Sequence, residues 1–452
     1  MASTVPSAVP GAQVVAVVGA GIAGLAAAVE LRRRGAVPVV LEASGEVGGK
    51  VRLADVGGLT VDEGADSMLR RVPYGVDLAT AAGLELVAPA VGAASIWTRG
   101  RLRPLPAGTL MGIPADLASL ARSEVLSAGG LAKVPLDLVR TGTPVTVDLS
   151  VGDLVTRRLG REVVERLVDP LLGGVYAGRA DLLSVQATLP QLWPHLASHR
   201  SLVLAARAAR AEPLPGPVFA GVPGGLGHLP PALARGLDVR LRTTVRGLAR
   251  TPSGWRVETG TAADPAYLDV DAVVLAVPAG PAARLLAGHA PAEDLAAVPY
   301  ASVGIVTLVL DGPSPGTGSG YLVPAVEGRT TKAVTFTSRK WDRPGAAVVR
   351  ASVGRVGEVA DLQRDDGELV ALVLAELEAA VGPVSPLVDS RVTRWGGGLP
   401  QYAVGHLDLV RRLRLALPPG VAVAGAAYDG VGVPAVARSG MEAARSVLAG
   451  DG

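Results

Sequence analysis

Apolar residues near the beginning of the chain fall into two continuous runs separated by a helical stretch. Residues 14–18 form an apolar, β-branched run, which is typical of a strand buried on both faces of a parallel sheet. An Ala- and Leu-rich stretch follows and ends at Gly35, and a second apolar run covers residues 37–41. The pattern predicts a strand, a helix and a second strand in close succession.

The same patterns continue at intervals along the chain. Another buried strand is predicted at residues 271–278, and further strands at residues 303–310 and 347–353 with an amphipathic helix at 369–380. Polar tips around Gly100 predict a hairpin over residues 97–103. Between residues 105 and 139, Pro and Gly interrupt apolar segments that we expect to be helical, including residues 110–120. Ser150 is expected to cap a helix that begins at Val151.

Three glycines separate the first strand from its helix. Gly19 permits a tight turn, Gly21 lets a pyrophosphate approach the backbone, and Gly24 allows close packing of helix on strand. The pyrophosphate then lies at the helix N-terminus, where unpaired N–H groups and the helix dipole favour negative charge. We therefore predict a dinucleotide site in which Ile22 and Ala23 also contact the cofactor.

An acidic residue closes the second strand. Glu42 follows the glycines by about 20 residues, the spacing at which a carboxylate accepts hydrogen bonds from ribose hydroxyls. The negative charge of Glu42 also disfavours the 2′-phosphate of NADP. Ala43, the next residue, is included in the predicted cofactor site.

A second glycine pair bears on the identity of the dinucleotide. Gly48 and Gly49 stand just before Lys50 and Arg52, so backbone can approach a ligand while the two cations reach a phosphate or a substrate carboxylate. A simple turn ahead of the next strand is the alternative. The stretch resembles the second signature of the FAD-dependent family that contains amine oxidases, phytoene desaturases and porphyrinogen oxidases. The resemblance implies FAD as the cofactor.

The composition narrows the range of functions. The chain has 452 residues, enough for two or three domains, and 49% of them are apolar. Lys plus Arg (43) nearly balance Asp plus Glu (41), so net charge does not point to nucleic acid or a membrane surface. The absence of cysteine excludes disulfides and thiolate chemistry. Five scattered histidines do not suggest a metal site, and 3% aromatic residues argue against an aromatic amine cage.

The uncharged beginning of the chain is not read as a membrane segment. Residues 1–29 carry no charged side chain, yet a basic leader is missing and glycines interrupt the apolar run. No other uncharged apolar run approaches the ~20 residues that cross a bilayer. We expect a soluble, cytoplasmic protein with a flexible tail at residues 1–12.

Three further strings narrow the resemblance to the porphyrinogen-oxidase branch. These are Pro-Leu-x-x-Gly-Val-Tyr-Ala-Gly at residues 170–178, Arg-Trp…Pro-Gln-Tyr…Gly-His at 394–406, and Gly-x-x-Tyr-x-Gly-x-Gly-x-Pro…Ser-Gly at 425–440. In this family the last helix points its N-terminus at flavin O2 and stabilises charge on the reduced ring. The resemblance adds the following cofactor contacts: Gly64, Ala65, Asp66, Ser67, Val245, Trp395, Gly425, Val431, Gly432, Val433 and Pro434.

The expected fold class is α/β, with a discontinuous Rossmann-like FAD-binding domain, an antiparallel-sheet substrate domain and a helical insertion. The sheet of the FAD-binding domain resumes at residues 271–278, after the insertion. The expected division is a tail (1–12), FAD-binding segments (13–80, 206–283 and 411–452), a helical substrate or lid domain (81–205) and the substrate domain (284–410).

The resemblance implies removal of six electrons from a porphyrinogen. Three rounds of flavin reduction, each reversed by O2 with release of H2O2, would yield the aromatic porphyrin. Because aromatisation drives the reaction, positioning matters more than a strong base. No catalytic residue and no metal ligand are predicted.

The propionates of the substrate call for cations at the cavity mouth. Arg71, Arg99 and Arg101 are the candidate clamps. Small residues (93–95) replace the arginine that membrane-bound protoporphyrinogen oxidases carry before the 97–103 hairpin. The Ala-, Arg-, Gly- and Val-rich composition resembles that of high-GC Gram-positive bacteria, whose family members use coproporphyrinogen III. We therefore expect that substrate.

Other functions remain open. The chain could act on protoporphyrinogen IX, or could be a flavin oxidase of amines or polyenes. A flavin-binding protein without catalysis is a further alternative. Expected partners are the porphyrinogen and O2, with no nucleic acid and with transient contacts to other haem-pathway enzymes.

Overall fold

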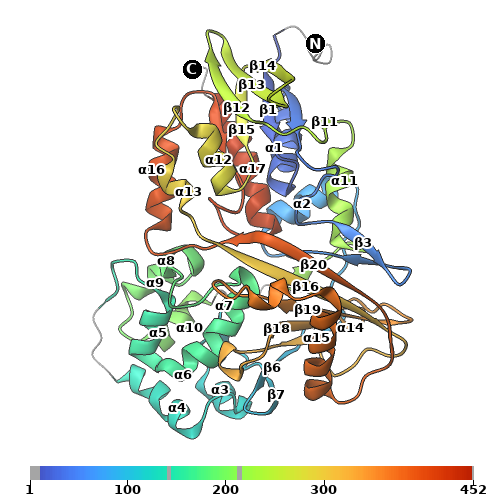
Figure 1. The fold of residues 1–452 in the computed structure, drawn as a ribbon. Coiled ribbons are helices and arrows are strands. Elements are labelled where there is room, and N and C mark those ends of the chain that lie inside the picture. Colours follow the sequence, from blue (N-terminus) through green and yellow to red (C-terminus); the bar gives the residue numbers. More distant parts are fainter. Residues whose placement is uncertain (1–10, 140–143, 211–215, 450–452) are drawn as a thin grey trace.

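A parallel sheet forms the upper part of the molecule (Figure 1). The structure, a computed structural model, describes residues 11–139, 144–210 and 216–449. Among these residues, five strands form the sheet in the order β11-β2-β1-β15-β21, and all neighbours are parallel. Their bounds are Val14–Val18 (β1), Val37–Leu41 (β2), Asp238–Arg240 (β11), Ala272–Leu275 (β15) and Val421–Val423 (β21). The strands predicted at 14–18, 37–41 and 271–278 are thus confirmed.

The parallel sheet draws its strands from three distant parts of the chain. β1 pairs with β2 on one side and with β15 on the other, and β21 extends the sheet beyond β15. This arrangement confirms the discontinuous α/β fold. The helices around the sheet are α1 (Ile22–Arg33), α2 (Pro73–Ala81), α11 (Leu229–Ala234), α12 (Ala279–Leu286), α13 (Glu293–Ala296), α16 (His406–Ala416) and α17 (Val433–Leu448). Small strands accompany them: β3 (Leu53–Val56), β4 (Leu59–Asp62), β5 (Met68–Leu69), β10 (Phe219–Ala220), β12 (Gly247–Thr251), β13 (Gly254–Gly260) and β14 (Pro265–Val270).

A second sheet lies in the lower right of Figure 1. Within the described ranges, seven strands form it in the order β20-β16-β19-β18-β17-β6-β7. Neighbours there are antiparallel, apart from the parallel pair β17 and β6. The bounds are Ala94–Thr98 (β6), Arg101–Pro104 (β7), Tyr300–Leu310 (β16), Gly320–Leu322 (β17), Thr331–Phe336 (β18), Ala347–Val353 (β19) and Leu387–Pro400 (β20). The predicted amphipathic helix is α15 (Asp366–Val381), which packs Leu369 and Val373 against this sheet, and α14 is Thr337–Lys340.

The helical insertion occupies the lower left of Figure 1. Its helices are α3 (Leu117–Ser123), α4 (Ala128–Lys133), α5 (Val151–Leu159), α6 (Arg161–Val163), α7 (Asp169–Tyr176), α8 (Val185–Thr188), α9 (Trp193–Leu196) and α10 (Leu202–Ala209). The predicted cap is confirmed, because Ser150 Oγ accepts a hydrogen bond from the Asp153 N–H at 3.0 Å. Short helical turns complete the fold: η1 (Val134–Leu138), η2 (Val164–Val168), η3 (Leu226–His228), η4 (Ala325–Glu327) and η5 (Ala360–Gln363).

The helix predicted at residues 110–120 is wrong in its first half. A two-stranded hairpin of β8 (Thr109–Leu110) and β9 (Ile113–Pro114) precedes α3. Gly112, with a φ of +87°, forms the turn, and Asp116 caps α3 by accepting hydrogen bonds from the N–H groups of residues 118 and 119. A left-handed turn and an N-cap both interrupt a helix.

Packing modifies the predicted segment boundaries at two points. The hairpin β6–β7 pairs with β17 and extends the antiparallel sheet, although the sequence placed it in the helical segment 81–205. β6 is buried on both faces, with Ile96 against the helices and Trp97 against the sheet. The predicted boundary at residue 284 falls inside α12, whose Leu285 and Leu286 pack in the core of the parallel sheet.

Residues 1–10 of the predicted tail are outside the described residues. Within the described ranges, no helix combines the length and apolarity needed to span a bilayer.

We expect Gly440→Ala to lower the stability of the protein. A Cβ on Gly440 in α17 would lie 2.0 Å from the carbonyl oxygen of Ala23 in α1, so the two helices would have to separate. Overpacking of this kind costs about 1–3 kcal/mol. The midpoint of thermal unfolding of the flavin-loaded protein should fall by several degrees.

Gly367→Ala is the matched control for this helix–helix contact. Gly367 lies in the first turn of α15, and a Cβ there would meet nothing within 4 Å. Because Ala favours a helix over Gly by about 1 kcal/mol, this variant should keep or raise the midpoint. Equal midpoints for Gly440→Ala and the unchanged protein would show that the two helices do not approach as closely as described.

Candidate active site

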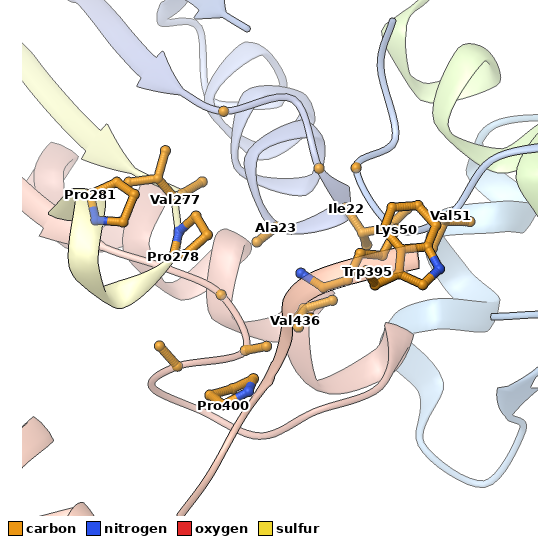
Figure 2. A pocket seen from close by; sticks show the side chains of 18 of the residues that line it. Ile22, Ala23, Lys50, Val51, Val277, Pro278, Pro281, Trp395, Pro400 and Val436 are labelled. Carbon is orange, nitrogen blue, oxygen red and sulfur yellow. The ribbon is translucent and has the colours of Figure 1, made fainter. Parts of the chain in front are cut away.

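A cavity of about 1140 Å³ lies where the parallel sheet, the antiparallel sheet and the helical insertion meet. Figure 2 shows part of its wall, with Pro278 after β15 on the left, Ala23 of α1 in the middle, and Ile22, Lys50 and Trp395 together on the right. Sites for one drug-sized ligand occupy roughly 300–1000 Å³. The cavity therefore has room for a cofactor together with a second molecule.

Most of the predicted cofactor residues line this cavity. They are Gly19, Gly21, Ile22, Ala23, Glu42, Ala43, Gly49, Lys50, Gly64, Ala65, Val245, Trp395, Gly425, Val431, Gly432 and Val433. The structure thus brings together segments that are up to about four hundred residues apart in sequence, as the order of the five parallel strands requires.

The first glycines make a backbone cradle at the N-terminus of α1. A Cβ on Gly24 would lie 1.8 Å from the carbonyl oxygen of Gly19, so Gly24 lies behind the cavity wall and allows helix and strand to touch. Gly19 has a φ of +101°. A Cβ on Gly21 would meet nothing within 4 Å, so its backbone is open to a ligand. This combination of open backbone and unpaired helix N–H groups fits a pyrophosphate.

Glu42 is held in place by backbone donors. Its Oε2 accepts a hydrogen bond from the Ala20 N–H at 2.7 Å, and its Oε1 accepts one from the Ser44 N–H at 2.8 Å. A carboxylate oxygen has about two lone-pair sites. Each oxygen of Glu42 therefore keeps acceptor capacity for a ribose hydroxyl.

Lys50 and Trp395 meet at the turn that contains Gly64. A Cβ on Gly64 would lie 1.9 Å from the Lys50 carbonyl oxygen and 3.7 Å from the Trp395 ring. The Trp395 indole N–H donates to the Glu63 carbonyl at 3.2 Å, and burial lowers the pKa of Lys50. Arg52, which the sequence also offered as a ligand group, lies 2.5 Å from the Glu63 carboxylate instead.

Asp66 and Ser67 support the cavity wall without lining it. The Asp66 carboxylate pairs with Lys340 at 3.0 Å and with Arg350 at 3.5 Å, and Ser67 Oγ donates to Asp66 at 2.9 Å. Burial raises the pKa of Asp66, but the charges of Lys340 and Arg350 outweigh burial and hold this pKa at about 2. Arg350 also donates to the Gly64 carbonyl. These bonds anchor the turn to the antiparallel sheet.

The last helix presents its N-terminus to the cavity. Gly432 caps α17 with a φ of +98°, and Val431, Gly432 and Val433 line the wall. Pro434 lies outside the lining and packs beside Gly75 of α2. The Gly425 N–H donates to Ser439 Oγ at 2.9 Å, which ties the strand end to the helix.

The candidate propionate clamps do not reach the cavity. Arg99 donates to the carbonyl oxygens of Glu124 and Leu126 at 3.2 and 2.8 Å, and Arg101 pairs with the Glu124 carboxylate. These bonds fix the β6–β7 hairpin to the loop after α3. Arg71 is exposed just before α2 and is not among the lining residues.

Several lining residues have no counterpart in the sequence prediction. The antiparallel sheet contributes Tyr300, Ile305, Lys332 and Ser352, and α7 contributes Gly174. Tyr300 Oη accepts a hydrogen bond from the Ala279 N–H at 2.9 Å, and burial raises the pKa of Tyr300. Strand alternation identifies such residues as buried, but only the sheet register shows that they face the cavity.

Comparisons with known proteins agree with this geometry. A coproporphyrinogen III oxidase of Mycobacterium tuberculosis is 38% identical over 449 residues, covering 96% of this chain and 96% of that protein. A coproporphyrinogen III oxidase of Bacillus subtilis is 31% identical over 462 residues, covering 96% and 97%. The crystal structure of a candidate protoporphyrinogen oxidase from Exiguobacterium has a TM-score of 0.86 and 32% identity, covering 96% of this chain and 98% of that one.

The family match confirms the resemblance seen in the sequence. Flavin is the cofactor of the matching family, and the cradle at Gly19 and Gly21 fits the dinucleotide form, FAD. The match, described as flavin containing amine oxidoreductase, extends over residues 22–448. The chain therefore belongs to the family of flavin-containing amine oxidoreductases.

Proposed function

We propose that the chain is an FAD-dependent oxidase of haem biosynthesis that converts coproporphyrinogen III to coproporphyrin III. One observation carries this proposal: a continuous cavity joins the dinucleotide cradle to the antiparallel sheet and α7 in a chain whose full-length relatives are named coproporphyrinogen III oxidase. The reaction removes six electrons in three steps, with O2 as the final acceptor and H2O2 as its product. A bound flavin supplies the hydride acceptor.

The residues around the cavity have distinct proposed roles. The N-terminus of α1 binds the pyrophosphate and Glu42 binds the ribose, while the backbone near Val245 contacts the adenine. The turn at Gly64 and Ala65 passes beneath the ring system. The N-terminus of α17, at Gly432, stabilises negative charge that develops on the reduced ring, because its N–H groups and dipole point toward the cavity.

Protoporphyrinogen IX is the second candidate substrate. The Exiguobacterium structure supports it, since it combines 32% identity with a name that points to protoporphyrinogen. The relatives named coproporphyrinogen III oxidase match nearly the whole chain, and one of them reaches 38% identity. We therefore place coproporphyrinogen III first. Cytoplasmic location and transient contact with other haem-pathway enzymes are part of the same proposal.

Glu42→Gln should weaken FAD binding. The amide keeps the shape of the side chain but loses the charge and replaces one acceptor oxygen by a donor nitrogen, which meets the backbone N–H of Ala20 or Ser44. A hydrogen bond to a charged group contributes about 1.5–3 kcal/mol. The Kd for FAD, measured by flavin fluorescence on apoprotein, should rise at least tenfold. Glu46→Gln, at an exposed residue paired with Arg52, is the control and should leave the Kd unchanged.

Aerobic porphyrin fluorescence tests the proposed activity directly. Purified protein with its flavin spectrum recorded is mixed with coproporphyrinogen III or with protoporphyrinogen IX in separate cuvettes. We expect a faster rise in fluorescence with coproporphyrinogen III and about three molecules of H2O2 per porphyrin, because each two-electron step reduces one O2. Faster oxidation of protoporphyrinogen IX would favour the second candidate. Bound flavin with no oxidation of either compound would contradict both.

A further inference from the structure

One lysine of the antiparallel sheet is buried in the cavity wall. Lys332 lies in β18, is 6% exposed and lines the cavity together with Ser352 of the adjacent β19 and Ile305 of β16. Its Nζ donates a hydrogen bond to the Gly354 carbonyl at 2.9 Å. A lysine is almost never fully buried without a counterion, so this position calls for an explanation.

A β-bulge in β18 contains Lys332. Thr331 pairs with Val353 and Ala333 pairs with Ser352, so β18 contributes one extra residue, Lys332, between two successive partners of β19. Bulges are common beside active sites, where they re-aim a side chain. Thr331 and Lys332, on either side of this irregularity, are both buried.

The surroundings of Lys332 disfavour its charged form. Burial and, to a lesser extent, the charge of the nearby Arg355 lower the pKa of Lys332 to about 7, while Glu358 opposes the shift. Glu358 pairs with Arg355 at 3.3 Å. On the α15 side, Glu376 accepts hydrogen bonds from the backbone N–H groups of residues 330 and 331. Asp361 of η5 accepts one from Thr330 Oγ1.

Other titratable groups also line the cavity, among them Lys50, which lies beside Trp395 and whose pKa burial lowers as well. Glu42 holds two backbone N–H groups at the dinucleotide end, and Tyr300 accepts the Ala279 N–H. Glu258 belongs to β13, which packs beside the parallel sheet. Among the described residues that line the cavity, Lys332 and the hydrogen-bonded Tyr300 are the titratable side chains that the antiparallel sheet contributes.

We propose that Lys332 is a catalytic residue that accepts the substrate proton released in each two-electron step. This inference rests on the proposed function. As a methylene bridge of the porphyrinogen loses hydride to the oxidised flavin, the adjoining pyrrole nitrogen loses its proton to the Lys332 amine and a C=N bond forms. The substrate thereby loses two electrons with the hydride, which a bound flavin would accept, and the amine becomes an ammonium group. The ammonium group returns its proton to solvent before the next step. After three such steps the fourth methylene bridge loses a proton and a ring nitrogen gains one, which completes the porphyrin.

Anaerobic stopped-flow measurement of flavin reduction by coproporphyrinogen III tests this role. The unchanged holoprotein should show kcat/KM and a reduction rate that rise with pH through about 7, because only the neutral amine accepts a proton. Lys332→Met should keep FAD, slow reduction by about 10²- to 10⁴-fold and lose this pH dependence. Lys332→Arg should be equally slow, since a guanidinium does not lose its proton.

Two further variants sharpen the test. Lys332→Ala should be accelerated by added ethylamine, which supplies a base in the vacated space. Lys133→Met, at an exposed residue of α4 away from the cavity, is the matched control and should keep the rate and the pH profile of the unchanged protein. The FAD content and thermal midpoint of each variant are measured alongside.

The possible outcomes separate this proposal from the proposed function. An active unchanged protein with a Lys332→Met variant of equal rate and pH profile overturns the role of Lys332 alone. A rise in KM without a loss of kcat, restored by Lys332→Arg, would make Lys332 a carboxylate clamp and also overturns it. If Lys332→Met does not hold FAD, a Lys332→Arg variant with the full rate overturns it. No flavin reduction by either porphyrinogen in the unchanged protein contradicts the proposed function and this inference together.

Discussion

The close approach of backbones around α1 is the constraint on which the cofactor site depends. A Cβ on Gly24 would lie 1.8 Å from the Gly19 carbonyl oxygen, one on Gly19 would lie 2.7 Å from the Ala276 carbonyl oxygen, and one on Gly440 would lie 2.0 Å from the Ala23 carbonyl oxygen. Close contacts between backbone atoms cannot be relieved by rotating a side chain. The position of α1 relative to β1, β15 and α17 is therefore fixed. The N–H groups at its first turn can then act as a preorganised anion site, with little reorganisation on binding.

Ion pairs built on two largely buried carboxylates connect this site to the antiparallel sheet. Asp66 is paired with Lys340 and Arg350, and the neighbouring Glu63 is paired with Arg52 and Arg391. Removing one partner of a buried pair is strongly destabilising, because it leaves an uncompensated charge. These ion pairs therefore hold the turn at Gly64 against the second sheet. In this way the segment beneath the proposed flavin position is held by residues more than two hundred positions further along the chain.

Local motifs were sufficient to predict the cradle, since its glycines, helix and Glu42 are contiguous in sequence and their geometry follows from backbone sterics. They also located the interrupted parallel sheet, because the apolar run at residues 271–278 has the same character as β1. Tertiary pairing could not be predicted in the same way. The sequence does not show that Arg99 and Arg101 already have partners. In the structure Arg99 donates to the carbonyls of Glu124 and Leu126, and Arg101 pairs with the Glu124 carboxylate. The bulge at Lys332 depends on the register between β18 and β19, and a shift of one residue changes the face on which a side chain lies.

The proposed oxidation of a porphyrinogen explains why a buried lysine would suit this position as a base. Three successive steps require a group that accepts a proton and releases it again before the next hydride leaves. A lysine at its usual pKa would accept the proton readily but would be charged already at neutral pH, while a carboxylate at its usual pKa would be a weak base. Burial in the sheet, with Arg355 nearby, lowers the pKa of the lysine to about 7. At neutral pH the amine can then both accept a proton and release it. Burial of the amine therefore allows one residue to accept and release a proton in each of the three steps. The hydrogen bond from Nζ to the Gly354 carbonyl keeps the amine in place between steps.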